Sequence, residues 1–181
     1  DSTKIWKSND SKKLIGFNRL SIIDPSIDSD QPMIEDKNKF LIVFNGEIYN
    51  YKHLREELIL EKSTFKTKSD TEVILKGFIH WGPEKLYNKL RGMFSVVILN
   101  LNNNNLIFFR DRIGMKPLFY FNDEKDLLIS SEIKPILNQL SSKKKFSLRK
   151  NYSNFLLELL IREVHKIKHY LKKFIHQGLV K

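Results

Sequence analysis

The pattern of apolar and polar residues predicts a strand followed by a helix in the first third of the chain. Residues 40–44 form an unbroken apolar run, which is typical of a buried strand. Residues 50–61 carry Tyr51, Leu54 and Leu58 at helical spacing. This spacing predicts an amphipathic helix with one buried face.

A second helix is predicted to begin at Ser69. Ser69 and Glu72 stand at the spacing of a capping box, which satisfies backbone N–H groups at a helix start. Gly82 and Pro83 then interrupt the pattern, and a short third helix is predicted over residues 84–89. The second helix has a buried stripe of large apolar residues: Ile74, Leu75, Phe78, Ile79 and Trp81.

The remaining pattern up to residue 140 is of the β type. A strand is predicted over residues 14–23, ending where Asp24-Pro25 disfavours continuation. An Asn-rich turn at residues 102–105 separates two apolar stretches and indicates a hairpin. The strands after the helices are predicted at residues 93–101, 106–110, 117–121 and 127–131. Strands, helices and strands again indicate an α+β layered domain.

Length and composition indicate a single globular domain and argue against disulfide-bonded, thiolate-metal and membrane-spanning classes of protein. The length of 181 residues suits one domain with a sizeable core. The chain contains no cysteine, which excludes disulfides and thiolate metal sites, and no metal site is expected. No apolar run approaches the roughly 18 residues that a membrane helix needs, and no signal peptide is visible. A cytoplasmic protein without membrane contact is therefore expected.

The net charge of +11 is concentrated near the C-terminus. Residues 141–181 hold 11 Lys and Arg against two Glu. Such a segment can bind a polyanion, but more often it is a solvated face, so nucleic acid is not the favoured partner. Residues 141–145 are predicted to be a linker, and residues 154–175 a helix whose first half alone is amphipathic.

The pair Asn45-Gly46, between the strand at 40–44 and the helix at 50–61, has two interpretations. Gly accepts a positive φ and Asn tolerates it, so the pair could be a plain turn. Alternatively, a side-chain amide beside an unshielded Gly N–H presents two donors to one oxygen atom. That arrangement is suited to an oxyanion hole.

Six further blocks accompany Phe44-Asn45-Gly46-Glu47-Ile48-Tyr49-Asn50 along the chain. They are residues 16–24 with 31–33, 69–75, 90–95, 110–118 and 130–134. In this order the blocks resemble the class II glutamine amidotransferase domain of glutamine-hydrolysing asparagine synthetases, over residues 1–140. The resemblance implies an incomplete Ntn-hydrolase-type fold, a four-layer αββα sandwich with two stacked antiparallel sheets, followed by a helical tail.

The resemblance also implies a role for individual residues. Arg19 matches the arginine that grips the carboxylate of L-glutamine, and a surface arginine is the alternative. Asp70 matches the acid that receives the ammonium, with Glu47 close by; the alternative, a helix-start charge, is compatible with that role. Asn45 and Gly46 match the oxyanion hole. The family also binds glutamine through main-chain groups of the segment that here runs from Arg19 through Leu20, Ser21, Ile22 and Ile23. Asp111 and Arg112 are interpreted as a turn and ion-pair network, with a catalytic role as the alternative.

The attacking group of the family has no counterpart in this sequence. The family uses an N-terminal Cys that is activated by its own α-amino group, and this chain has no Cys. Its first residues resemble the segment after the family's Arg-Gly-Pro-Asp motif. A fragment that does not hydrolyse glutamine is therefore expected. ATP and Mg²⁺ would serve the synthetase domain, the partner that is expected in the parent enzyme.

Two other functions stay open from the sequence. One is a glutamine-binding module without catalysis, and the other is a basic interaction protein that works through residues 141–181. Beyond about residue 157 the chain loses the family's pattern and becomes rich in Lys and His. One hypothesis is that this tail is read out of frame, so that its charge was never selected to bind anything.

Overall fold

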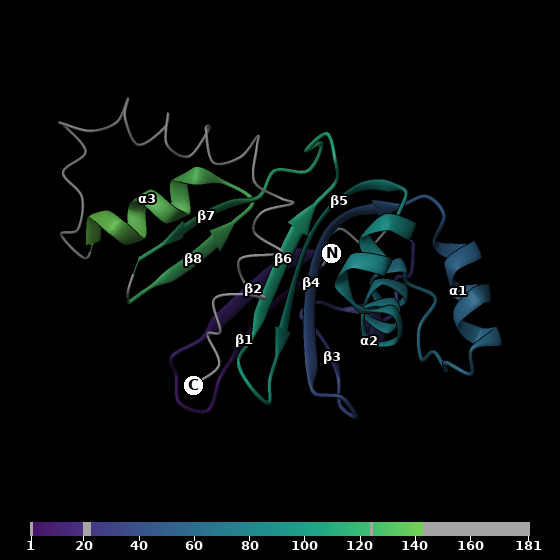
Figure 1. The fold of residues 1–181 in the computed structure, drawn as a ribbon. Helices are drawn as coiled ribbons and strands as arrows, with labels where there is room; N and C mark the ends of the chain where they lie inside the picture. Colours follow the sequence, from purple (N-terminus) through teal and green to yellow (C-terminus); the bar gives the residue numbers. More distant parts are fainter. Residues whose placement is uncertain (1, 20–22, 124, 143–181) are drawn as a thin grey trace. The chain divides into compact units, whose positions relative to one another are not determined.

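The computed structural model describes residues 2–19, 23–123 and 125–142, which divide between Lys116 and Pro117 into two compact units (Figure 1). The second unit contains the hairpin of β7 (Phe119–Asn122) and β8 (Leu127–Ser130) and the helix α3 (Ile133–Ser142). The first unit contains β1 (Ser2–Lys7), β2 (Leu14–Arg19), the 3-10 turn η1 (Ile27–Ser29), β3 (Met33–Glu35), β4 (Phe40–Ile48), α1 (Tyr51–Leu60), α2 (Asp70–Lys89), β5 (Gly92–Asn100) and β6 (Leu106–Arg110). The α+β class is confirmed.

The first unit is organised around an antiparallel sheet of four strands in the order β3-β4-β5-β6. β4 and β5 are its long central strands, and Asn45 stands opposite Ser95 in their register. β1 and β2 form a separate antiparallel hairpin. Neither β1 nor β3 was predicted, since β1 is mostly exposed and β3 has only three residues.

Helices α1 and α2 cover one face of the four-stranded sheet (Figure 1). Ile42, Phe44 and Ile48 of β4 pack with Leu58 of α1 and Ile74 of α2 in one core. Because successive side chains in a strand point to opposite faces, Asn45 and Glu47 belong to the face away from the helices. The fold thus places two of the predicted site residues on one face of the sheet.

β4 and β5 approach closely at a pair of glycines. A Cβ on Gly46 would lie 2.0 Å from the carbonyl oxygen of Met93, and a Cβ on Gly92 would lie 2.1 Å from that of Glu47. Gly46 has φ of 143°, which other residues rarely adopt. These glycines let β4 run without interruption to Ile48, four residues beyond the predicted apolar strand.

The start and the break of α2 agree with the sequence. The Ser69 hydroxyl accepts the Glu72 N–H at 3.3 Å, and Gly82 has a non-helical φ of 77° where the break was predicted. The other half of the predicted capping box, a hydrogen bond from the Ser69 N–H to the Glu72 side chain, is wrong. The Glu72 carboxylate accepts the N–H groups of Lys66 and Thr67 instead, at 2.9 and 2.7 Å. It therefore fixes the loop before the helix.

Two predicted boundaries need correction. The described part of β2 is Leu14–Arg19, residues 20–22 lie outside the described residues, and Ile23 lies outside any strand, so the strand does not reach Ile23 as predicted. The carbonyls of Asp24 and Ser26 accept from the Arg19 guanidinium. The linker does not begin at residue 141, since α3 continues to Ser142. The helix predicted over residues 154–175 lies outside the described residues. None of the helices in the described ranges has the length and apolar character to cross a bilayer.

Candidate functional site

Asp70 brings the start of α2 to the end of β4. Its side chain is buried, and one carboxylate oxygen accepts the Ile48 N–H at 3.1 Å. Burial raises the pKa of Asp70 above its ordinary value, and the nearby charge of Glu47 adds to the rise. Backbone N–H groups offset only part of this effect. A cation at this position would stabilise the charged carboxylate.

Asn45, Gly46 and Glu47 occupy the same end of β4. Asn45 and Gly46 are half-buried and Glu47 is exposed. The pair Asn45-Gly46 lies inside the strand, opposite Ser95 and Phe94, so the interpretation as a plain turn is wrong. Ile48 follows directly and donates to Asp70, and the charge of Glu47 acts on Asp70, so Glu47 lies near this carboxylate, while Asn45 and Gly46 precede it along β4.

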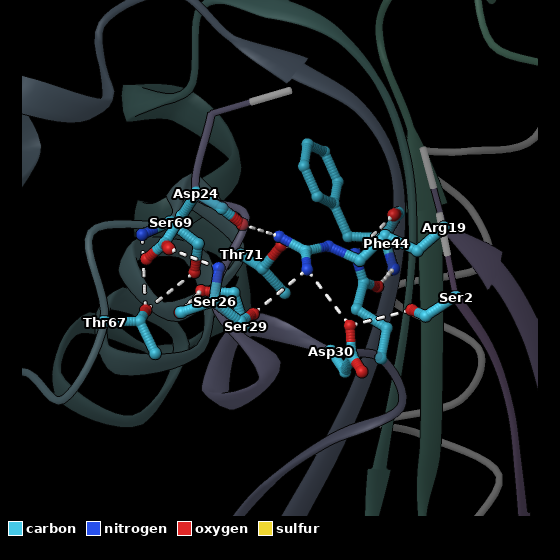
Figure 2. A network of polar contacts seen from close by, with 11 residues as sticks. Ser2, Arg19, Asp24, Ser26, Ser29, Asp30, Phe44, Thr67, Ser69 and Thr71 are labelled. Carbon is cyan, nitrogen blue, oxygen red and sulfur yellow. Dashed lines mark hydrogen bonds and ion pairs between the residues drawn. The ribbon is translucent and has the colours of Figure 1, made fainter. Parts of the chain in front are cut away.

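Arg19 ends β2 as a buried side chain, so its interpretation as a surface arginine is wrong. Its guanidinium pairs with the Asp30 carboxylate at 3.0 Å and donates to the Ser26 carbonyl at 3.2 Å and to the Asp24 carbonyl (Figure 2). Leu20, Ser21 and Ile22 lie outside the described residues, and Ile23 is half-buried. Arg19 therefore already holds one carboxylate in this structure.

Asp30 is itself held from β1. The Ser2 hydroxyl donates to the Asp30 carboxylate at 2.8 Å (Figure 2). This hydrogen bond, together with the Arg19 guanidinium, keeps the pKa of Asp30 below its ordinary value although burial opposes the shift. The carboxylate is therefore ionised where it meets Arg19.

Asp24 connects the loop after β2 to the start of α2. Its carboxylate accepts the Ser26 N–H at 3.0 Å and the Lys68 N–H at 2.7 Å. Burial alone would raise the pKa of Asp24, but these backbone donors outweigh it and hold the pKa well below the ordinary value. Since Lys68 is two residues before Asp70, this contact links the Arg19 loop to the Asp70 helix.

The comparison with known proteins identifies the family of the chain. A sequence profile described as a glutamine amidotransferase domain matches residues 1–178. The chain belongs to this family. The fold resembles the glutamine PRPP amidotransferase of Bacillus subtilis, with a TM-score of 0.55 at 23% identity over 67% of this chain and 28% of that one. At this identity the likeness shows a shared fold over the matched part of the chain.

Curated relatives of the amidotransferase domain are named asparagine synthetases. The glutamine-hydrolysing asparagine synthetase 1 of Bacillus subtilis is 45% identical over 122 residues, covering 67% of this chain and 19% of the relative. Asparagine synthetase 2 of the same organism is 36% identical over 160 residues, covering 87% and 20%. A putative asparagine synthetase of Mycobacterium tuberculosis is 40% identical over 146 residues, covering 76% and 22%. The chain thus spans about a fifth of the length of these relatives.

Asp111 has the turn-forming part of the role that the sequence suggested. Its carboxylate accepts the backbone N–H groups of Phe94, Ile113, Gly114, Met115 and Lys116 at 2.7–3.1 Å. These donors keep the pKa of Asp111 below its ordinary value against the effect of burial. In the amidotransferase domain this residue therefore fixes a turn after β6.

Sequence analysis missed the residues that connect the parts of the site. Asp24, Asp30 and Gln31 each bridge segments that are distant in the chain. Gln31 stood in one of the recognised blocks, but its side-chain partners could not be read from local patterns. The only signal in the sequence was its position directly before Pro32 and Met33, and its burial is seen in the structure alone.

Proposed function

We propose that this chain binds the glutamine from which a glutamine-hydrolysing asparagine synthetase obtains its ammonia. The observation that carries the proposal is the buried carboxylate of Asp70, which accepts the Ile48 N–H at the end of β4, the strand that also carries Asn45, Gly46 and Glu47. A buried acid with a raised pKa in such a position is a candidate for a ligand contact.

Each part of glutamine has a chemical counterpart among these residues. Asp70, with Glu47 near it, would receive the α-ammonium, and Arg19 with the main chain of residues 19–23 would receive the α-carboxylate. Since Asp30 already occupies the guanidinium, glutamine would share Arg19 with it. The Asn45 amide and the Gly46 N–H would stabilise the amide oxygen. In other enzymes one such donor contributes about 2.7–4 kcal/mol.

Hydrolysis needs a nucleophile that these residues do not supply. Attack on an amide requires an activated thiol, hydroxyl or comparable group with a positioned base. The 181 residues contain no thiol, and the family's reaction uses one. We therefore propose that the chain in this form binds glutamine without hydrolysing it. The second candidate is a glutamine-binding module that is not part of a glutamine-hydrolysing enzyme, and the absence of Cys is compatible with both candidates.

The wider reaction rests on the relatives. In the proposed parent enzyme the ammonia is used by a synthetase domain that converts aspartate to asparagine, with ATP and Mg²⁺ bound there. The complete amidotransferase domain would be a four-layer αββα sandwich. These features of the parent are proposals for this chain, because it spans about a fifth of its relatives.

The experiment that separates the two candidates is a glutaminase assay on two chains. The 181-residue chain should release no glutamate from L-glutamine, whereas the same chain preceded by the family's N-terminal segment with its Cys should release it. A matched chain with that Cys replaced by Ala is the control. If the extended chain folds and binds glutamine but stays inactive, the non-catalytic module is the correct function.

A further inference from the structure

The side chain of Gln31 joins β4 to the first turn of α2. Its amide nitrogen donates to the Phe44 carbonyl at 3.0 Å and to the Thr71 hydroxyl at 3.2 Å. Its amide oxygen accepts the Phe44 N–H at 2.5 Å. Only 4% of Gln31 is exposed, so these hydrogen bonds lie in the protein interior. The bridge connects residues 40 positions apart in the chain.

The register of the sheet explains why a side chain, and not the backbone of a neighbouring strand, bonds to Phe44. The ladder between β3 and β4 starts with Met33 opposite Ile42, and continuing it would place Gln31 opposite Phe44. Pro32 stands between and has no N–H to offer the ladder. The Gln31 amide supplies both a donor and an acceptor to Phe44, as a neighbouring strand would.

The two residues that Gln31 joins, Phe44 and Thr71, are the sequence neighbours of the candidate site residues Asn45 and Asp70. Phe44 directly precedes Asn45, and Thr71 directly follows Asp70. Asp70 in turn accepts the Ile48 N–H, so covalent and hydrogen bonds close a ring through Gln31, Phe44, Ile48, Asp70 and Thr71. Asn45, Gly46 and Glu47 are the residues of β4 inside this ring.

We propose that Gln31 is a positioning residue that fixes the spacing between the Asn45-Gly46 donors and the Asp70 carboxylate. The inference rests on the proposed glutamine site. Glutamine spans that spacing, because its amide would meet Asn45 and Gly46 while its ammonium meets Asp70. A ligand that uses only the Asp70 end does not depend on the spacing. Gln31 therefore determines preference for the amide as well as affinity.

The test is calorimetric titration of the 181-residue chain with two ligands. L-Glutamine contacts both ends of the site, and L-norvaline keeps the α-amino acid group and a straight three-carbon side chain without the amide. Gln31→Met removes the hydrogen bonds at similar volume. A misplacement of about 1 Å costs about a hundredfold in catalysis, and by the same sensitivity to position we expect glutamine binding to weaken roughly ten- to hundredfold and norvaline binding to change much less.

Asn50→Leu is the matched control. The Asn50 amide also bridges two segments, donating to the Lys89 carbonyl and accepting the Arg91 N–H, each at 3.0 Å. Its partners do not flank the candidate site residues. This substitution should lower the free energy of unfolding while leaving the ratio of glutamine to norvaline affinity unchanged.

Two results would overturn the inference while the glutamine site stands. One is unchanged glutamine binding in Gln31→Met, and the other is an equal loss for both ligands, which indicates a purely structural role. If Gln31→Met does not fold, Thr71→Val gives the same test, because it removes one hydrogen bond of the bridge and should lower the same ratio by a smaller factor. A wild-type chain that folds but binds no glutamine would instead overturn the proposed function, and the inference with it.

Discussion

Asp70 and Asp111 are two buried aspartates in the first unit whose surroundings differ in kind. Asp70 is 5% exposed and Asp111 is 4% exposed. Asp111 accepts five backbone N–H groups, which lower its pKa against the effect of burial. Asp70 accepts the Ile48 N–H, and burial raises its pKa. Both carboxylates accept backbone N–H groups. At Asp111 these donors outweigh the effect of burial on the pKa, whereas at Asp70 the N–H groups of Ile48, Thr71 and Asp70 itself do not.

The difference separates a structural acid from a ligand-binding acid. A carboxylate that backbone donors saturate stabilises the turn that supplies them, and it has little to offer a ligand. A buried carboxylate with fewer donors is costly while it stays unpaired, and an incoming ammonium lowers that cost. Asp111 thus belongs to the scaffold and Asp70 to the proposed site.

The largest effect that we expect from this comparison is on stability. Asp111→Ala should lower the free energy of unfolding by about 3 kcal/mol or more, because several buried N–H groups lose their acceptor. Urea denaturation measures this loss. Asp111→Asn should cost less, since one oxygen can still accept. At temperatures where the variants stay folded, glutamine affinity should not change; a selective loss of affinity would place Asp111 in the site.

A smaller effect is expected in the pH dependence of stability. Because the pKa of Asp70 is raised in the folded state, its favourable contribution is full below 3.8 and is lost as the pH rises through the raised value. Asp70→Asn should therefore gain stability relative to wild type as the pH rises through that range. A tenfold difference in proton affinity between the folded and unfolded states changes the free energy of unfolding by about 1.36 kcal/mol.

The pKa of Asp111 is lowered, so its contribution has the opposite sign. It is present above 3.8 and is lost as the pH falls through the lowered value. At low pH, Asp111→Asn should therefore lower the free energy of unfolding by less than at neutral pH. Asp70→Asn should also raise the free energy of unfolding by less there. Urea denaturation at pH 3 to 7 measures both. Parallel pH profiles for wild type and Asp70→Asn would contradict the assignment of Asp70.

The elements of the fold were largely predictable from local patterns. Apolar spacing located α1, and Ser69 and Gly82 marked the start and break of α2. The length of β4 was not predictable, because Asn45-Gly46 looks like a turn until the close approach of Met93 and Gly92 is known. The exposed strand β1 lacks any apolar pattern strong enough to indicate a strand.

The site was predictable in its parts but not in its connections. The motifs pointed to Asp70, and the structure places it against Ile48, 22 positions away in the chain. The bridges made by Asp24 and Gln31 span 44 and 40 positions. No local pattern specifies such partners, because they depend on how strands and helices pack. The role of Arg19 toward glutamine remains a prediction, since Asp30 holds it here.

The measurement that tests the central claim most directly is the titration of L-glutamine into wild type and Asp70→Asn at neutral pH. A hydrogen bond to a charged group contributes about 1.5–3 kcal/mol, so affinity should fall roughly ten- to hundredfold while the free energy of unfolding stays equal or rises. If Asp70→Asn binds glutamine as tightly as wild type, Asp70 is a structural acid like Asp111, and the proposed site is wrong.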